Sequence, residues 1–170
     1  MKKLPFIVVL FVIVLLGMAC RQEHHKASAP KPLTQRQLID FNRRLLRQEK
    51  RRIDAFIKAH HWKMKETGTG LRYQFVKRGS GPRAKTGQKV VIRYTVKLFD
   101  GRQVYSGEKT FTVGFGGVES GLEEGILLMK RGDEARFILP SHLAYGLSGD
   151  GKKIPPHTPI IYRVELLSIK

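Results

Sequence analysis

The chain has 170 residues, enough for one compact domain with additional segments, and 41% of them are hydrophobic. Lys and Arg outnumber Asp and Glu by 32 to 14, so the formal net charge is +18, which indicates an acidic partner, an anionic surface or solvated tails. The single cysteine excludes an internal disulfide.

Residues 1–19 have the pattern of an export signal. A positive n-region precedes an apolar stretch from Leu4 to Leu16, which is too short and wrongly flanked for a transmembrane helix. Small or modest residues then precede Cys20, and this junction resembles the lipobox of bacterial lipoproteins. The resemblance implies that 1–19 is a signal peptide and that Cys20 is acylated, which leaves no thiol for catalysis or metal binding. An uncleaved signal anchor is the alternative.

Residues 20–33 have little apolar content and two prolines, and they are predicted to be a flexible tether that starts at the lipidated cysteine. The protein is therefore expected in the cell envelope, lipid-anchored and facing the periplasm, with the choice between inner and outer membrane left open.

A long amphipathic helix is predicted from about residue 34 to about residue 60. Thr34 and Gln37 have the spacing of a capping box, and no Pro or Gly interrupts the stretch that follows. The apolar residues that recur at steps of three and four are Leu38, Phe41, Leu45, Leu46, Ile53, Phe56, Ile57 and His60. Because the other face is rich in Arg and Lys, the segment 34–66 is predicted to be a basic helical arm.

Such an arm could bind nucleic acid, lie on anionic lipid, or pack its apolar stripe on a domain or a second copy of itself. An exported lipoprotein does not meet nucleic acid, and we favour the packing interpretation. The stripe of Leu38, Leu45, Ile53 and Phe56 predicts a homodimer through this helix.

The segment 67–170 is predicted to be an α+β domain, with an antiparallel sheet of about five strands wrapped on one short helix. From Leu71 onward apolar residues alternate with a period of two, as in half-buried strands. Strands are expected at 71–77, 90–98, 103–106, 110–113, 135–139 and 160–169, and a short helix at 122–129.

Ordinary catalytic motifs are missing from this domain. It has no G-x-S-x-G or H-E-x-x-H sequence, and its histidines lack zinc-ligand spacing. We therefore expect neither a metal nor a cofactor. Aromatic and aliphatic residues instead gather near the ends of the predicted loops: Tyr94, Phe111, Leu122, Tyr145, Ile154 and Tyr162.

Three stretches, VVIRYTVKLFDGRQV, VESGLEEGILLMKRGDEARFILPSHLAYG and IPPHTPIIYRVELLSI, resemble the FK506-binding-protein (FKBP) type of peptidyl-prolyl cis-trans isomerase. The resemblance runs from about Gly87 to Lys170, and the strand at 71–78 belongs with it. The signal and the helical arm resemble exported bacterial members, in particular the gliding-motility-associated isomerase lipoproteins.

The resemblance implies a pocket that binds proline. Tyr94, Phe111 and Tyr162 would line it, and the hydroxyl of Tyr145 would donate to a substrate carbonyl. These four residues are the catalytic candidates.

Six further residues are candidates for substrate binding by the same resemblance. Leu122 would form the base, Val118 and Ile154 the walls, and the backbone N–H of Glu119 would donate to the carbonyl near the proline. Val104 stands where the family often has Phe, and Tyr105 where it usually has Asp. If the lost carboxylate matters, Tyr105→Asp should raise the rate.

The implied function is isomerisation of prolyl bonds in unfolded or partly folded exported proteins. Rotation about such a bond faces a barrier of roughly 18–20 kcal/mol from amide resonance, and no covalent step is needed. An apolar pocket would disfavour the planar, dipolar amide relative to the twisted one. The alternative is a weakly catalytic or non-catalytic module that binds proline peptides as a chaperone or in complex assembly.

Overall fold

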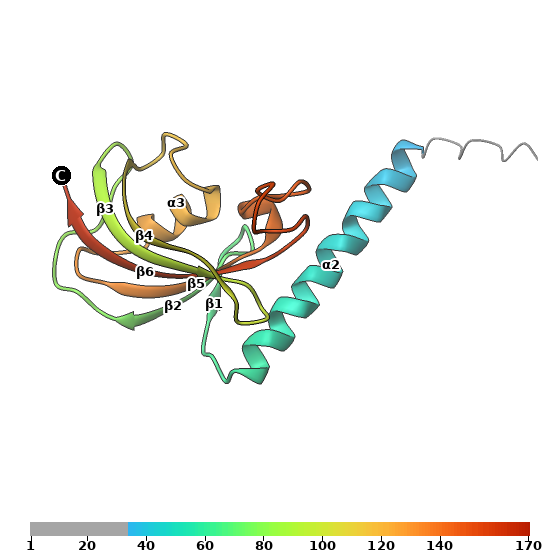
Figure 1. Ribbon diagram of the computed structural model, residues 1–170, viewed down its shortest axis with the longest axis horizontal. Helices are drawn as coiled ribbons and strands as arrows, with labels where there is room; N and C mark the ends of the chain where they lie inside the picture. The colour runs from blue at the N-terminus through green and yellow to red at the C-terminus, as the bar shows by residue number, and fades with distance from the viewer. Residues whose placement is uncertain (1–33) are drawn as a thin grey trace, which may run out of the picture. The chain divides into compact units, whose positions relative to one another are not determined.

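The computed structural model describes residues 34–170 (Figure 1), so the predicted signal peptide, Cys20 and the tether lie outside the described residues. Residues 39–170 form one compact unit. The predicted helix is present as α2, Gln35–Ala59. Its capping box is confirmed, since Thr34 N–H donates to Gln37 Oε1 (2.8 Å) and Gln37 N–H donates to Thr34 Oγ1 (3.3 Å). Within the described range, no helix is both long and apolar enough to cross a membrane.

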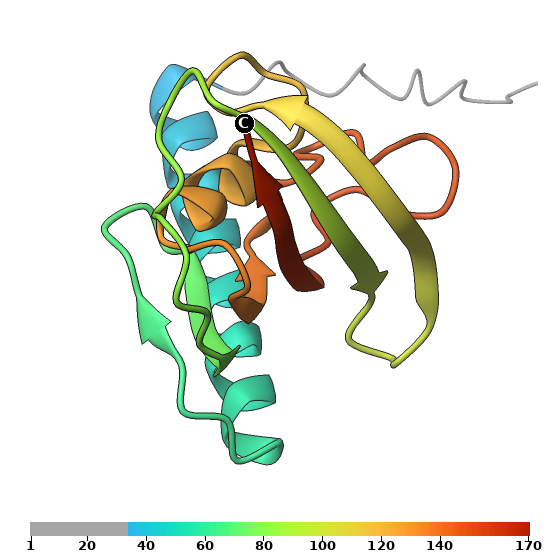
Figure 2. The ribbon, with the colours of Figure 1, turned by 90° about the vertical axis from the view of Figure 1, so that its left-hand side faces the viewer.

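The sheet is antiparallel throughout and has six strands in the order β1-β2-β5-β6-β3-β4 (Figure 1, Figure 2). The α+β class is confirmed. The elements of the domain are β1 Lys65–Glu66, β2 Arg72–Lys77, β3 Lys89–Lys97, β4 Gln103–Thr112, α3 Ser120–Leu127, β5 Glu134–Leu139, the 3-10 turn η1 Ser141–Leu143, and β6 Ile160–Ile169.

The six strands differ from the expected sheet in two places. The short strand β1, at the end of the predicted arm, pairs with β2. The strands expected at 103–106 and 110–113 are one strand, β4, which pairs with β3 from Lys89 opposite Thr112 to Lys97 opposite Gln103. The expectation of two strands was wrong because residues 106–110 of this edge strand are exposed and polar, and so lack the alternation that indicates a strand.

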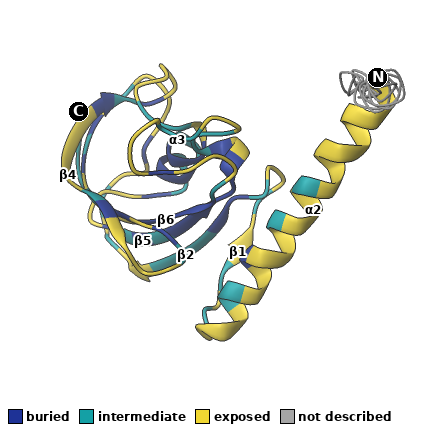
Figure 3. Cartoon of the chain, turned by 45° about the vertical axis from the view of Figure 1, so that its right-hand side comes forward, coloured by how far each residue is buried: buried dark blue, intermediate teal, exposed yellow. Residues whose placement is uncertain are grey.

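The main core lies between α3 and one face of the sheet, as the burial colouring of Figure 3 shows. Alternate residues of β3 and β6, such as Ile92 and Val164, are fully buried on this face. In α3, a Cβ at Gly125 would lie only 2.9 Å from the ring of Phe137, so glycine lets the helix approach β5 closely. This approach sets the depth at which the N-terminal end of α3 meets β3 and β6.

The opposite face of the sheet receives the C-terminal half of α2. Ile53 is 2% exposed and packs with Ile138 and Ile161. Phe56 stacks on Phe99 with ring centroids 4.2 Å apart. The predicted packing of the stripe on the domain is therefore present in this half of the helix, so Ile53 and Phe56 are not free to hold a second copy.

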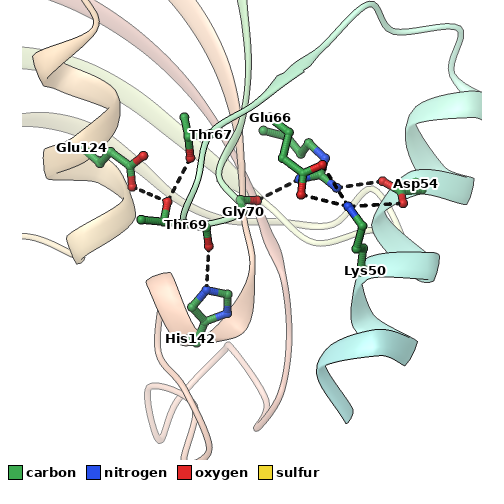
Figure 4. A network of polar contacts seen from close by, with 9 residues as sticks. Lys50, Asp54, Glu66, Thr67, Thr69, Gly70, Glu124 and His142 are labelled. Atoms are coloured by element: carbon green, nitrogen blue, oxygen red, sulfur yellow. Dashed lines mark hydrogen bonds and ion pairs between the residues drawn. The ribbon is translucent and has the colours of Figure 1, made fainter. Parts of the chain in front are cut away.

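Ion pairs fix α2 to β1 and β2 (Figure 4). The guanidinium of Arg72 is almost fully buried and pairs with Asp54 (2.9 Å) and Glu66 (2.6 Å). Lys50 also pairs with Glu66 (2.8 Å), and these contacts lower the pKa of Glu66, with the Lys50 hydrogen bond the largest cause. The network makes α2 and the sheet of residues 39–170 one packed structure.

Candidate functional site

A cavity of about 220 Å³ lies between β3, β4, β6, the start of α3 and the loop after η1. Nine residues line it: Ile92, Tyr94, Tyr105, Lys109, Val118, Glu119, Leu122, Tyr145 and Tyr162. Seven of these nine residues are among the ten that were predicted from the sequence for one pocket, and they come from strands and loops far apart in the chain.

The secondary structure explains how the walls of the cavity form. Ile92 and Tyr94 point to the same face of β3 because side chains alternate along a strand. Tyr162 lies on the neighbouring strand β6, with its ring centroid 5.9 Å from that of Tyr94. Leu122, in the first turn of α3, is 1% exposed and forms the apolar base.

The cavity also contains a group of hydroxyls around one carboxylate. The hydroxyl of Tyr162 donates to Glu119 Oε2 at 3.0 Å. Burial raises the pKa of Tyr162 far above its usual value, and the negative charge of Glu119 adds to this. Burial also raises the pKa of Tyr145, as does hydrogen bonding to Glu119. Both phenols therefore stay protonated at neutral pH and act as neutral hydrogen-bond donors.

A second carboxylate reaches the cavity wall from the loop after η1. The hydroxyl of Tyr105 donates to Asp150 Oδ2, and this bond is the main cause that raises the pKa of Tyr105. Asp150 Oδ1 accepts the backbone N–H groups of Lys152 (2.9 Å), Lys153 (2.9 Å) and Ile154 (2.8 Å). Burial alone would raise the pKa of Asp150, but these hydrogen bonds outweigh it and lower the pKa to about 2. Asp150 thus ties the loop to β4.

Three predicted site residues do not line this cavity. Phe111 is 6% exposed and belongs to the core beneath the loop that follows β4. Val104 and Ile154 are also buried, and they line a neighbouring groove of about 580 Å³ under the 148–156 loop. Each of these side chains supports the cavity from behind or beside it.

Sequence reasoning missed three residues of the site. Ile92 had a usable signal, since it lies two residues before Tyr94 on the same strand face. Lys109 and Asp150 had none, because their placement depends on the register of β4 and on the path of the loop. Among residues 34–170, no group of three or more His, Cys, Asp or Glu side chains is placed to hold a metal ion.

A larger groove of about 830 Å³ lies beside α2 on the other face of the sheet. Its carboxylates are already in ion pairs: Glu165 with Arg93 (2.9 Å) and Glu134 with Arg163. It offers no convergent set of hydroxyls, so the smaller cavity is the better candidate site.

The comparison with protein families decides the identity of the fold. The model of the FKBP-type peptidyl-prolyl cis-trans isomerase matches residues 81–167. The chain belongs to this family. The match contains all ten predicted pocket residues.

Relatives and solved structures agree with the family. The probable FKBP-type peptidyl-prolyl cis-trans isomerase FkpA of Neisseria meningitidis is 35% identical over 126 residues, 71% of this chain and 46% of that protein. The macrophage infectivity potentiator of Trypanosoma cruzi is 41% identical over 106 residues, 60% of this chain and 54% of that protein. The chain thus spans about half the length of these curated relatives.

The match to two solved structures spans almost their whole length. The crystal structure of a peptidyl-prolyl cis-trans isomerase from Pseudomonas syringae has a TM-score of 0.63 and 26% identity, and the match covers 73% of this chain and 95% of that one. The crystal structure of AtFKBP13 has a TM-score of 0.61 and 29% identity, covering 64% of this chain and 99% of that one.

Proposed function

We propose that this protein is a peptidyl-prolyl cis-trans isomerase that acts on proline-containing segments of unfolded or partly folded exported proteins. The observation that carries the proposal is the 220 Å³ cavity, in which Tyr94, Tyr162 and Leu122 supply aromatic and aliphatic walls for a prolyl ring and Tyr145 supplies a hydroxyl. Family membership supports the same reaction.

The chemistry follows from the amide bond. An X–Pro bond isomerises in tens to hundreds of seconds without a catalyst, because twisting it destroys resonance. The planar amide is dipolar, so an apolar cavity disfavours it relative to the twisted state. The protonated Tyr145 hydroxyl donates to a carbonyl of the bound segment, and the backbone N–H of Glu119 donates to the carbonyl next to the proline. No proton is transferred and no covalent bond forms.

The proposed division of the chain is a signal peptide at 1–19, an acylated Cys20 with a tether to residue 33, an arm at 34–66 and the isomerase domain at 67–170. The export pattern in the first 20 residues supports anchoring in the cell envelope. Mass spectrometry of the N-terminal peptide tests this, with acylated Cys20 expected. Cys20→Ala should release the protein into the soluble fraction, and an unmodified Met1 in the mature protein would contradict the anchor.

We further propose that the N-terminal half of α2 holds a second copy of the chain. Ile39, Phe41 and Leu46 are each about half exposed there (45%, 53% and 49%). Sedimentation of the purified protein should show a dimer, and Phe41→Glu should shift it to a monomer. A monomer at high concentration of the unmodified protein would exclude this proposal.

The isomerisation assay tests the central proposal. The purified protein in detergent is mixed with a short peptide that contains one Xaa-Pro bond, and relaxation from cis to trans is followed with and without protein. Acceleration in proportion to protein concentration is expected. If the peptide binds but isomerises at the uncatalysed rate, the alternative of a binding module is favoured.

A further inference from the structure

Glu119 has an unusual place at the start of α3. It is the N-cap residue, with an extended backbone (φ −60°, ψ 143°), yet its side chain makes no hydrogen bond to the N–H groups of the helix. An N-cap side chain normally accepts such a bond. The carboxylate of Glu119 turns instead into the cavity and accepts the hydroxyl of Tyr162 at 3.0 Å.

The negative charge of Glu119 is not neutralised by a neighbour. Most acidic side chains of residues 34–170 lie within 4.0 Å of an Arg or Lys, but no cationic side chain of this range lies that close to Glu119. Its donors are tyrosine hydroxyls, which carry no charge. Of the nine residues that line the cavity, only Glu119 and Lys109 belong to the acidic and basic residue types.

We propose that Glu119 makes the cavity selective for a proline that is preceded by Lys or Arg. The inference rests on the proposed isomerase function. Because the Glu119 side chain lines the cavity that would receive the prolyl ring, the residue bonded to the proline nitrogen would lie near its carboxylate. An ammonium or guanidinium there pairs with the free carboxylate oxygen, while a Glu at the same position is repelled.

The size of the effect follows from partial exposure. Glu119 is half-buried and Lys109, on the exposed edge strand β4, faces the same cavity with the opposite charge. Ion pairs of this kind are worth at most about 1 kcal/mol, which corresponds to about fivefold in kcat/KM. We therefore expect a preference of about two- to fivefold for Lys over an uncharged residue of similar shape.

Three peptides that differ only in the residue before proline test the inference: Lys, norleucine or Glu. The kcat/KM values of the full protein in detergent should fall in that order. The Lys-to-norleucine ratio should approach one in about 1 M NaCl, where the Debye length is ~3 Å. Glu119→Gln keeps an acceptor for Tyr162 but removes the charge, so the ratio should fall to about one. Glu124→Gln is the matched control, since Glu124 lies in the same helix outside the cavity, and it should keep the preference.

The outcomes separate this inference from the proposed function. If the norleucine peptide is isomerised no faster than in buffer, the proposed function fails and the selectivity falls with it. The selectivity is wrong, and the function stands, if isomerisation of the norleucine peptide is accelerated but the Lys-to-norleucine ratio of kcat/KM is one. The same holds if that ratio does not change with NaCl, or if it persists in a folded Glu119→Gln variant. Should the variant not fold, the salt series on the unmodified protein decides.

Discussion

Tyr162→Phe removes one hydroxyl from the floor of the cavity without changing the volume of the ring. Tyr162 is 3% exposed, and its hydroxyl donates to the Glu119 carboxylate at 3.0 Å. A hydrogen bond to a charged group contributes about 1.5–3 kcal/mol to the free energy of unfolding. Because Glu119 is half-buried and water can replace part of the lost bond, we expect a loss of about 1–2 kcal/mol.

Urea unfolding followed by circular dichroism measures this loss, with an unchanged m value as the sign of an unchanged unfolded state. Tyr73→Phe is the control, since Tyr73 is a half-buried tyrosine of β2 whose ring packs edge-on against Phe75 and whose hydroxyl makes no hydrogen bond to another side chain of residues 34–170. Its loss should stay within about 0.5 kcal/mol. A double-mutant cycle of Tyr162→Phe with Glu119→Ala, in which each substitution removes one partner of the hydrogen bond, should give a coupling energy of about 1 kcal/mol. Equal losses in the two Phe variants, or a coupling near zero, would refute the tie between Tyr162 and Glu119.

Three further predictions concern the docked helix and the loop after η1. Ile53→Ala should lower the free energy of unfolding by about 2–4 kcal/mol, because Ile53 is buried against the sheet. Arg51→Ala, at an exposed position two residues earlier in α2, should change it by no more than about 0.5 kcal/mol, and equal effects of the two substitutions in urea unfolding would contradict the docking. The pKa of Asp150 is about 2 in the folded protein, below its unfolded value, so the contribution of Asp150 to stability is full above about pH 4 and disappears toward pH 2. Asp150→Asn should flatten this part of the pH–stability curve, and an unaltered curve would argue against the hydrogen bonds to Asp150. Tyr105→Asp should lower Tm at pH 7 more than Tyr105→Phe does, because it places a second carboxylate beside Asp150, and it should not raise the isomerisation rate. A Tyr105→Asp variant that is faster and as stable as Tyr105→Phe would contradict this prediction.

The sequence predicted the sheet and both helices because their signals are local. Alternation in β3 and β6 and the capping box at Thr34 each follow from neighbouring residues, and the structure contains all three. The single strand β4 was misread because Gly107 and the polar residues around it give no alternation on an exposed edge. Pairing with β3 extends that strand where its own sequence does not.

The sequence predicted which aromatic side chains meet at the candidate site, but it did not predict the hydrogen bonds among them. The family resemblance placed Tyr94, Tyr145 and Tyr162 together, and the cavity contains all three. It gave Glu119 a role for its backbone alone, whereas the side chain is what joins the cavity floor to α3. The expected gain from Tyr105→Asp also changes, since Asp150 already supplies a carboxylate from a loop whose path the sequence does not specify.

The most direct test of the account is the isomerisation rate of an Xaa-Pro peptide in the presence of the unmodified protein and of Leu122→Asp. Leu122 is 1% exposed and forms the base of the cavity, so Leu122→Asp replaces that apolar base with a charge. Thermal unfolding shows whether the variant remains folded. The account predicts acceleration by the unmodified protein and a loss of most of it in the folded variant. Full activity of a folded Leu122→Asp variant, or no acceleration by the unmodified protein, would contradict the claim that this cavity, with its apolar base, catalyses prolyl isomerisation.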